Sequence, residues 1–241
     1  MKFDGNLSYL FNTGNNSGLI RNSIIPVYKD DCTILTRFTP DIETMTRIMP
    51  DIGYLSCGIV CKNGMHIGIF FKQIVNHVGN DPWVFRFSFE YWEEGATEQT
   101  ILDIDIDPNT IDGRSFDIEL TKKGKTFIFS VDDETVEGSY RKLVDYSDAY
   151  LWVGAANKLA PDWKHELYGD LDKMYIELED TLPYTRRLFF DDYDSFRDKV
   201  VTRKNSKVVF LSNFKKVTYY KIFDDSDNGN HPIKYDEEWV Q

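Results

Sequence analysis

The chain is short of several features, and each shortage removes a class of protein. Only three of its 241 residues are cysteine, which is too few for a disulfide scaffold. No apolar run approaches 18 residues, so the sequence predicts no membrane-spanning helix. Basic residues are outnumbered, with 28 Lys and Arg against 40 Asp and Glu and a formal charge of −12. A general binder of nucleic acid or of anionic membranes is therefore not expected.

The cysteines Cys32, Cys57 and Cys61 are expected to be buried, reduced thiols. If Cys57 and Cys61 share a strand, they lie about 13 Å apart at roughly 3.3 Å per residue, too far for a disulfide bond. The first eighteen residues lack a cationic start followed by an apolar stretch. We therefore expect synthesis in a cytoplasm without a signal peptide, and nothing in the sequence calls for a cofactor.

Alternation of apolar and polar residues is the main pattern that is present. Between Trp83 and Trp92 every second residue is aromatic, and the intervening residues are mostly polar. Such a period of two predicts strands with one buried face. Other strands are expected at 24–27, 33–38, 55–60, 65–71, 102–106, 116–121, 127–131, 150–155 and 171–178. Roughly ten short strands without intervening helices favour an antiparallel sandwich, an all-β fold.

The pattern changes after Pro183. Phe189, Tyr193, Phe196 and Val200 have the spacing of one helix face and predict a short amphipathic helix. Residues 199–221 carry seven Lys or Arg and no acid, whereas 224–239 carry six acids and one lysine. The alternation of the basic stretch with apolar residues, and the acids beside it, favour a paired strand or an assembly arm over a nucleic-acid site. We therefore expect an N-terminal arm at 1–19, a sandwich at 20–184 and a C-terminal appendage at 185–241.

Four segments together resemble the concanavalin A-like, laminin-G-like jelly rolls, in family order and at about family spacing: Asp31–Asp41, Ser115–Asp133, Tyr150–Asn157 and Tyr168–Glu177. The resemblance covers residues 20–184. It implies two packed, curved antiparallel sheets, with a rim or concave face available for a ligand. It does not fix an activity, because this fold hosts sugar-binding modules, glucanases, lyases and protein-interaction domains. Asp133 departs from the family, which often has glycine in this turn.

No catalytic residues are expected. Glucanases of this fold resemble one another in a Glu-x-Asp-x-x-Glu strand motif, which the chain lacks. Asp103, Asp105 and Asp107 share one strand face, and a solvated surface accounts for them more simply than catalysis does. A retained alternative is a carbohydrate-active enzyme, a glycoside hydrolase or lyase, whose acids come from separate strands.

No metal site is expected either. Asp224, Ser226 and Asn228 with Gly229 fit the first half of a calcium loop. However, Tyr235 stands where the loop needs a bidentate Glu. The four histidines are scattered and there is no second cysteine pair, so zinc is not predicted.

The candidate ligand-binding residues are Asn157, Asp162, Trp163 and Trp92. The first three lie in a polar loop between two recognised strands. An aromatic ring beside Asn and Asp is typical of sugar binding, because the ring stacks on C–H faces and the polar groups bond hydroxyls. The structural alternative is that Trp163 covers a sandwich edge or contacts a neighbouring subunit. Trp92 lies on the polar side of its strand.

The sequence thus favours a non-catalytic recognition or assembly protein. We expect a bacteriophage virion component, in the tail or associated with the capsid, that assembles with other subunits as an oligomer. Its lectin-like domain is expected either to bind host-surface glycan or to brace the particle. A soluble cytosolic lectin is a third hypothesis.

Overall fold

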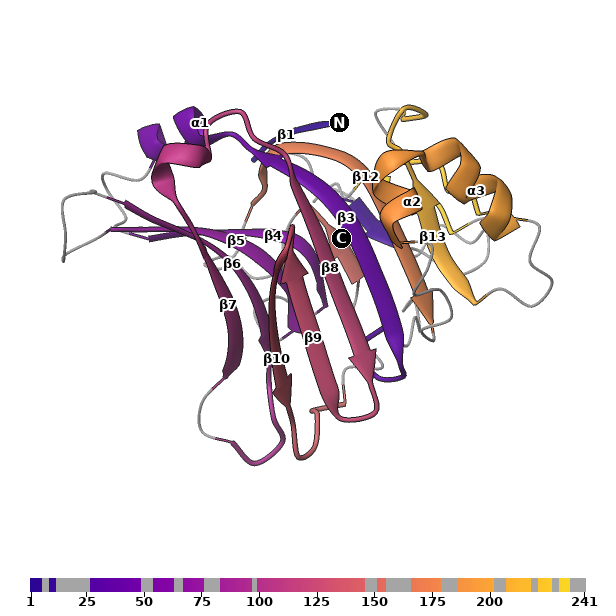
Figure 1. Ribbon diagram of the computed structural model, residues 1–241, viewed down its shortest axis with the longest axis horizontal. Coiled ribbons are helices and arrows are strands. Elements are labelled where there is room, and N and C mark those ends of the chain that lie inside the picture. Colours follow the sequence, from indigo (N-terminus) through magenta and orange to yellow (C-terminus); the bar gives the residue numbers. More distant parts are fainter. Residues whose placement is uncertain are drawn as a thin grey trace, which may run out of the picture.

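The computed structural model describes residues 1–5, 9–11, 27–48, 54–62, 67–75, 83–96, 99–145, 151–154, 166–178, 186–201, 207–217, 221–226 and 230–234. Within these ranges the strands form two sheets whose neighbouring strands all pair antiparallel (Figure 1). No helix there is long and apolar enough to cross a membrane.

Sheet A has the strand order β1-β12-β3-β8-β9-β10, and β13 also pairs with β12. Its strands are β1 (Lys2–Asp4), β3 (Cys32–Pro40), β8 (Phe116–Lys123), β9 (Thr126–Val131), β10 (Glu134–Ser139), β12 (Tyr168–Leu178) and β13 (Val208–Ser212). Sheet B has the order β14-β2-β11-β4-β5-β6-β7. Its strands are β2 (Tyr9–Phe11), β4 (Tyr54–Lys62), β5 (Ile67–Val75), β6 (Trp83–Tyr91), β7 (Thr100–Ile106), β11 (Leu151–Val153) and β14 (Pro232–Lys234).

Aromatic side chains fill the space between the sheets. The rings of Phe87 and Phe116 lie 5.1 Å apart between centroids, and those of Phe89 and Phe127 lie 4.6 Å apart. These four side chains are fully buried, and each is worth about 1.5–3 kcal/mol of hydrophobic stabilisation. The predicted antiparallel sandwich with an aromatic core is therefore confirmed.

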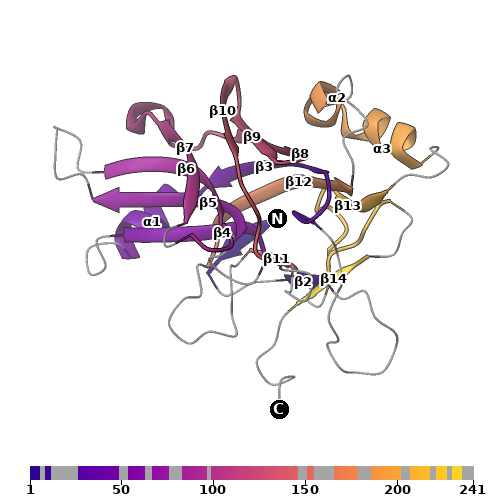
Figure 2. The same ribbon diagram turned by 90° about the horizontal axis from the view of Figure 1, so that it is seen from below.

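Two helices cover part of the outer face of sheet A, the face turned away from sheet B (Figure 2). They are α2 (Arg186–Asp191) and α3 (Tyr193–Val201). On the sheet, Leu35 lies opposite Tyr175, and Tyr175 lies opposite Leu211. This apolar row is buried beneath Phe189, Phe196 and other helix residues. The row gives the helices a hydrophobic platform of their own, separate from the main core.

The predicted single helix is instead two helices that meet at Asp192. The Asp192 carboxylate accepts hydrogen bonds from the backbone N–H of Ser195 at 3.1 Å and from its hydroxyl at 2.6 Å. This N-cap starts α3, so the chain changes direction between the two apolar segments. The apolar spacing from Phe189 to Val200 continues across Asp192, so the spacing alone does not reveal the break between the two helices.

Both flanking segments contribute strands to the sandwich. β1 and β2 come from the first eleven residues, and β13 and β14 come from beyond residue 185. The sequence offered a paired strand only within residues 199–221, where β13 lies, and it missed β1, β2 and β14, which are three residues long each. It also missed β10 and two short helices, α1 (Ile42–Ile48) and the 3-10 helix η3 (Pro108–Thr110). Short elements carry too few residues for a period to be recognised.

Candidate functional site

A polar groove lies on the outer face of sheet A, beside α2 and over the strands that the helix does not cover. Its volume is about 470 Å³. Strands β8 and β9 and the turn after β9 supply Asp117, Glu119, Ser130, Asp132 and Asp133. Helix α2 supplies Arg187, Phe190 and Asp191. We call these eight residues the outer groove.

The groove follows from side-chain alternation along paired strands. Leu35 lies opposite Glu119, and Glu119 lies opposite Ser130. The outward row of sheet A therefore changes from apolar under the helices to polar beyond β3. The helices cover the apolar part and leave the polar part open.

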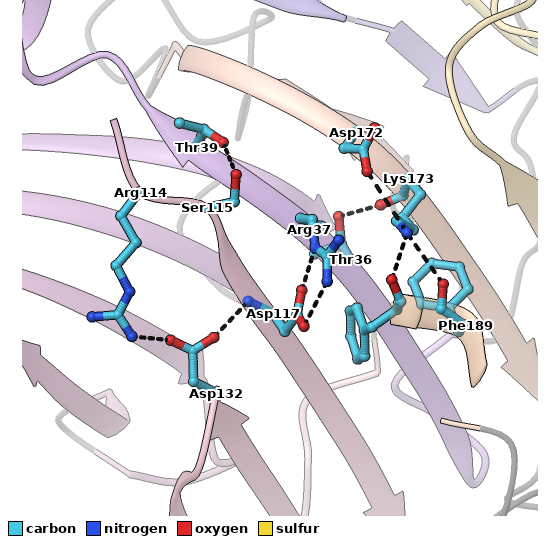
Figure 3. A network of polar contacts seen from close by, with 11 residues as sticks. Thr36, Arg37, Thr39, Arg114, Ser115, Asp117, Asp132, Asp172, Lys173 and Phe189 are labelled. Atoms are coloured by element: carbon cyan, nitrogen blue, oxygen red, sulfur yellow. Dashed lines mark hydrogen bonds and ion pairs between the residues drawn. The ribbon is translucent and has the colours of Figure 1, made fainter. Parts of the chain in front are cut away.

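Arg37 fixes one wall of the groove. Its guanidinium donates to both carboxylate oxygens of Asp117, at 2.5 Å from Nε and 2.8 Å from the terminal nitrogen (Figure 3). The Asp117 hydrogen bond raises the pKa of Arg37. The same guanidinium lies 5.6 Å from the centre of the Phe190 ring. A two-point contact of this kind holds both side chains in one orientation.

Asp132 forms a second fixed point, in the turn between β9 and β10. Its φ of 51° lies in the left-handed region, where Asp is tolerated better than most residues. Its carboxylate accepts the Asp117 backbone N–H at 2.9 Å and the Arg114 guanidinium at 2.5 Å (Figure 3). These contacts fix a turn in which the family's usual glycine is absent.

Lys173 anchors α2 beside the groove. Its ammonium group donates to the carbonyls of Phe189 at 3.3 Å and Phe190 at 2.9 Å (Figure 3). Burial, together with the nearby Arg37 charge, lowers the pKa of Lys173. The ammonium therefore satisfies carbonyls at the end of a short helix and keeps the Phe190 ring at the groove wall.

The groove combines the groups that bind a polyhydroxylated ligand. Carboxylates accept hydrogen bonds from hydroxyls, the Arg187 guanidinium donates them, and the half-buried Phe190 ring offers a surface for C–H groups. The volume lies within the usual range of small-molecule sites, about 300–1,000 Å³. Asp117 and Asp132 are each bound by a guanidinium, so both carboxylates are held in one orientation.

No protein-family model and no curated protein matches the sequence. Among solved structures, the enzymatically active domain of bacteriophage CBA120 tailspike protein 2 is 12% identical, with a TM-score of 0.44 over 67% of this chain and 24% of that one. The CBM40 of Ruminococcus gnavus IT-sialidase is 10% identical, with a TM-score of 0.45 over 75% and 90%. Mouse laminin α1 domains LG4–5 are 11% identical, with a TM-score of 0.39 over 71% and 42%.

The described strands form the two-sheet antiparallel sandwich that the resemblance to concanavalin A-like jelly rolls implies. It spans about a quarter of the length of the two tailspike structures that it matches. At these identities and TM-scores the comparisons say nothing of the site's chemistry, which is argued from this chain's own residues.

Of the four residues predicted to bind ligand, the structure describes only Trp92. Asn157, Asp162 and Trp163 lie outside the described residues. Trp92 is half-buried and follows β6, where its carbonyl accepts the backbone N–H of Val144 at 3.4 Å. It therefore borders the segment 141–145 rather than the groove, and its role in binding stays a prediction.

The acids considered for catalysis or calcium have structural partners. Asp103 and Asp105 both bind the Arg86 guanidinium, and Asp103 also accepts the Ser88 hydroxyl at 2.6 Å. Asp107 caps η3 by accepting the backbone N–H of Asn109, which lowers the pKa of Asp107. These acids organise the protein surface.

Asp224 is likewise used inside the fold. Its carboxylate accepts the backbone N–H groups of Leu211 at 3.0 Å, Ser226 at 3.0 Å and Asn230 at 3.1 Å, and the Ser226 hydroxyl at 2.8 Å. Donor hydrogens thus occupy the positions that a calcium ion would need. Among the described residues, no group of three or more His, Cys, Asp or Glu side chains is arranged to hold a metal ion.

The cysteines fit the sequence expectation. Cys32, Cys57 and Cys61 are buried free thiols, and burial raises the pKa of Cys32 to about 11 and that of Cys57 to about 12. Such thiols are poor nucleophiles.

Proposed function

We propose that the chain is a non-catalytic recognition protein that binds a neutral glycan in the outer groove. The observation that carries this proposal is the fixed pair of Arg37 and Asp117 beside the half-buried Phe190 ring. A sugar hydroxyl meets acceptors that are already oriented, so binding orders few protein side chains and costs little entropy. The ring supports the apolar face of the same sugar.

The absence of catalysis is part of the proposal. Glycoside hydrolysis needs one carboxyl group that donates a proton and a second that acts as base or nucleophile. In the groove, Asp117 and Asp132 are each bound to an arginine, which holds both carboxylates in place as hydrogen-bond acceptors. Release of reducing sugar from a polysaccharide panel, lost in Glu119→Gln, would instead support the carbohydrate-active enzyme.

We further propose that the protein assembles with other subunits in a bacteriophage particle. The support is the separation of basic and acidic segments after residue 199, which suits contact between subunits. Mass spectrometry of purified particles tests this part. Peptides from the whole chain at constant stoichiometry are expected, and their absence from intact particles would refute virion membership.

Binding to the groove is tested with a panel of neutral disaccharides: lactose, maltose, cellobiose and chitobiose. We expect at least one to bind with a Kd near millimolar by calorimetry. Phe190→Ala should weaken that binding about tenfold, which corresponds to about 1.4 kcal/mol of lost stacking. The matched control is Glu137→Gln, an exposed carboxylate on neighbouring β10 that does not line the groove.

The same experiment can fail in two informative ways. If no disaccharide binds at tens of millimolar, the groove is not a glycan site. If binding is unchanged in Phe190→Ala and in Asp117→Asn, the glycan lies elsewhere on the protein.

A further inference from the structure

A second pocket lies at the other end of the β8–β9 hairpin from Asp117. Its volume is about 340 Å³. The lining comes from residues 27–29, from Lys125 in the hairpin turn and from residues 140–145. The Tyr140 backbone N–H donates to the Lys125 carbonyl at 3.0 Å, and the Lys29 ammonium lies 3.9 Å from Asp145, so the three segments are joined. We call these residues the cationic pocket.

The charge of this pocket is opposite to that of the whole chain. Lys29, Lys125, Arg141 and Lys142 line it, against the single acid Asp145. The chain as a whole carries a formal charge of −12. Four cations against one acid give the lining of this pocket a local positive charge. Such an arrangement is typical of an anion site.

Two of these cations are available to a ligand. The side chains of Lys125 and Arg141 are exposed and form no ion pair with any residue in the part of the chain that the structure describes. Lys142 is bound to Glu94 at 2.6 Å, and Lys29 is held near Asp145. Lys125 and Arg141 are therefore the groups that would meet a bound anion.

The walls of the pocket are apolar and fixed. The Tyr140 hydroxyl donates to the Gly124 carbonyl at 3.0 Å, and its ring lies 5.4 Å from the Phe127 ring. Tyr28 is buried, and its hydroxyl donates to the Val60 carbonyl at 3.2 Å. An inorganic anion would gain nothing from these rings, whereas an organic ring would.

A buried lysine lies behind one wall of the pocket, with the Asp31 carboxylate 3.8 Å from its ammonium group. The Lys122 residue is 2% exposed, and its ammonium lies 5.6 Å from the centre of the Tyr140 ring. It donates to the same Gly124 carbonyl at 2.9 Å. The Tyr140 ring therefore lies between the Lys122 ammonium and the pocket, and its hydrogen bond to Gly124 holds it there.

We propose that the cationic pocket binds a carboxylate-bearing sugar. The carboxylate bonds Lys125 and Arg141, and the C–H face of the sugar ring packs on Tyr140 and Leu143. The pocket volume is at the small end of ligand sites, which suits one sugar ring with its substituents. This site is separate from the outer groove and of opposite charge.

The probe is D-glucuronate, with D-glucose as its neutral match, measured by NMR titration of the full chain. We expect glucuronate to bind at least tenfold more tightly than glucose and to weaken as salt is raised. Lys125→Gln with Arg141→Gln should reduce glucuronate binding at least tenfold. Lys123→Gln, a neighbouring exposed lysine outside the pocket, serves as the control and should leave it unchanged.

Three more measurements distinguish a sugar site from a general anion site and from a protein-binding site. Phe190→Ala in the outer groove should not alter glucuronate binding, so failure of the groove proposal leaves this one testable. Equal affinity for inorganic phosphate would overturn the sugar assignment and indicate a general anion site. Binding of a poly-glutamate peptide without binding of glucuronate would overturn it in favour of an acidic protein partner.

Discussion

At the scale of single residues, Asp132 joins the fold to the proposed site. It adopts a left-handed backbone conformation, and its side chain bonds both the Asp117 backbone and Arg114. Strain in the backbone is therefore offset by two hydrogen bonds to a charged group. We therefore expect the stability lost on replacing Asp132 to depend on whether the new residue tolerates a positive φ.

The first prediction compares two replacements of Asp132. Asp132→Ala loses both side-chain contacts and keeps the unfavourable backbone, so it should lower the free energy of unfolding by about 2–3 kcal/mol. Asp132→Gly loses the same contacts but relieves the backbone, so it should be about 1 kcal/mol more stable than the alanine variant. Urea unfolding measures both, and Asp133→Ala in the same turn is the control. Equal stability of the Ala and Gly variants would show that the backbone is not strained.

The second prediction concerns Asp192 and pH. Hydrogen bonds from the Ser195 hydroxyl and backbone N–H lower the pKa of Asp192 below its ordinary value of 3.8. A carboxylate with a lowered folded-state pKa contributes stability above the unfolded pKa and loses it as pH falls through the folded pKa. Asp192→Ala should therefore be less stable than the native chain at neutral pH, and the difference should shrink below about pH 4.

Denaturant midpoints of both proteins between neutral and acidic pH measure this difference. Asp192→Asn is the matched variant, because an asparagine caps a helix without titrating. A gap between the native chain and the alanine variant that stays constant across the whole range would contradict the capping role.

At the scale of elements, α2 and α3 decide which part of sheet A is open. Phe196 is buried, and its ring lies 5.0 Å from that of Tyr175 and 5.2 Å from that of Phe189. Lys173 adds hydrogen bonds to the end of α2. The helices are therefore part of the packed fold, and the groove depends on them for Phe190 and Arg187.

The third prediction removes these elements. A chain ending at residue 184 should expose the row of Leu35 and Tyr175, bind a hydrophobic dye and associate in gel filtration. Phe196→Ala is a milder variant that should still fold and lose about 3–5 kcal/mol of stability. A truncated chain that stays monomeric with unchanged melting would mean that the C-terminal part is an independent arm.

The sequence predicted the long strands but not the elements that build the site. Alternation over six or more residues was sufficient for β6, β8 and β9, because one face of each packs on the core. The outward residues Asp117, Glu119 and Ser130 were visible in the same pattern. The sequence did not predict that these residues share a groove with Arg187 and Phe190. That arrangement depends on contacts between segments about 60–70 residues apart, which a local pattern does not encode.

At the scale of the whole molecule, the two proposed sites lie at opposite ends of β8. Asp117 is near its first residue and Gly124 follows its last, a separation of roughly 23 Å along a strand. The outer groove is acidic, with five acids against one exposed arginine, and the cationic pocket has four cations against one acid. One saccharide chain with neutral and acidic residues, or two separate ligands, fits this arrangement.

The central claim is that a neutral glycan binds in the outer groove, and NMR titration of the isotope-labelled chain tests it most directly. The probe is the neutral disaccharide that binds best by calorimetry. We expect shift changes to gather at Asp117, Ser130 and Phe190, and the Kd fitted from them to rise about tenfold in Phe190→Ala. Changes that gather on sheet B, or an unchanged Kd in Phe190→Ala, would contradict it.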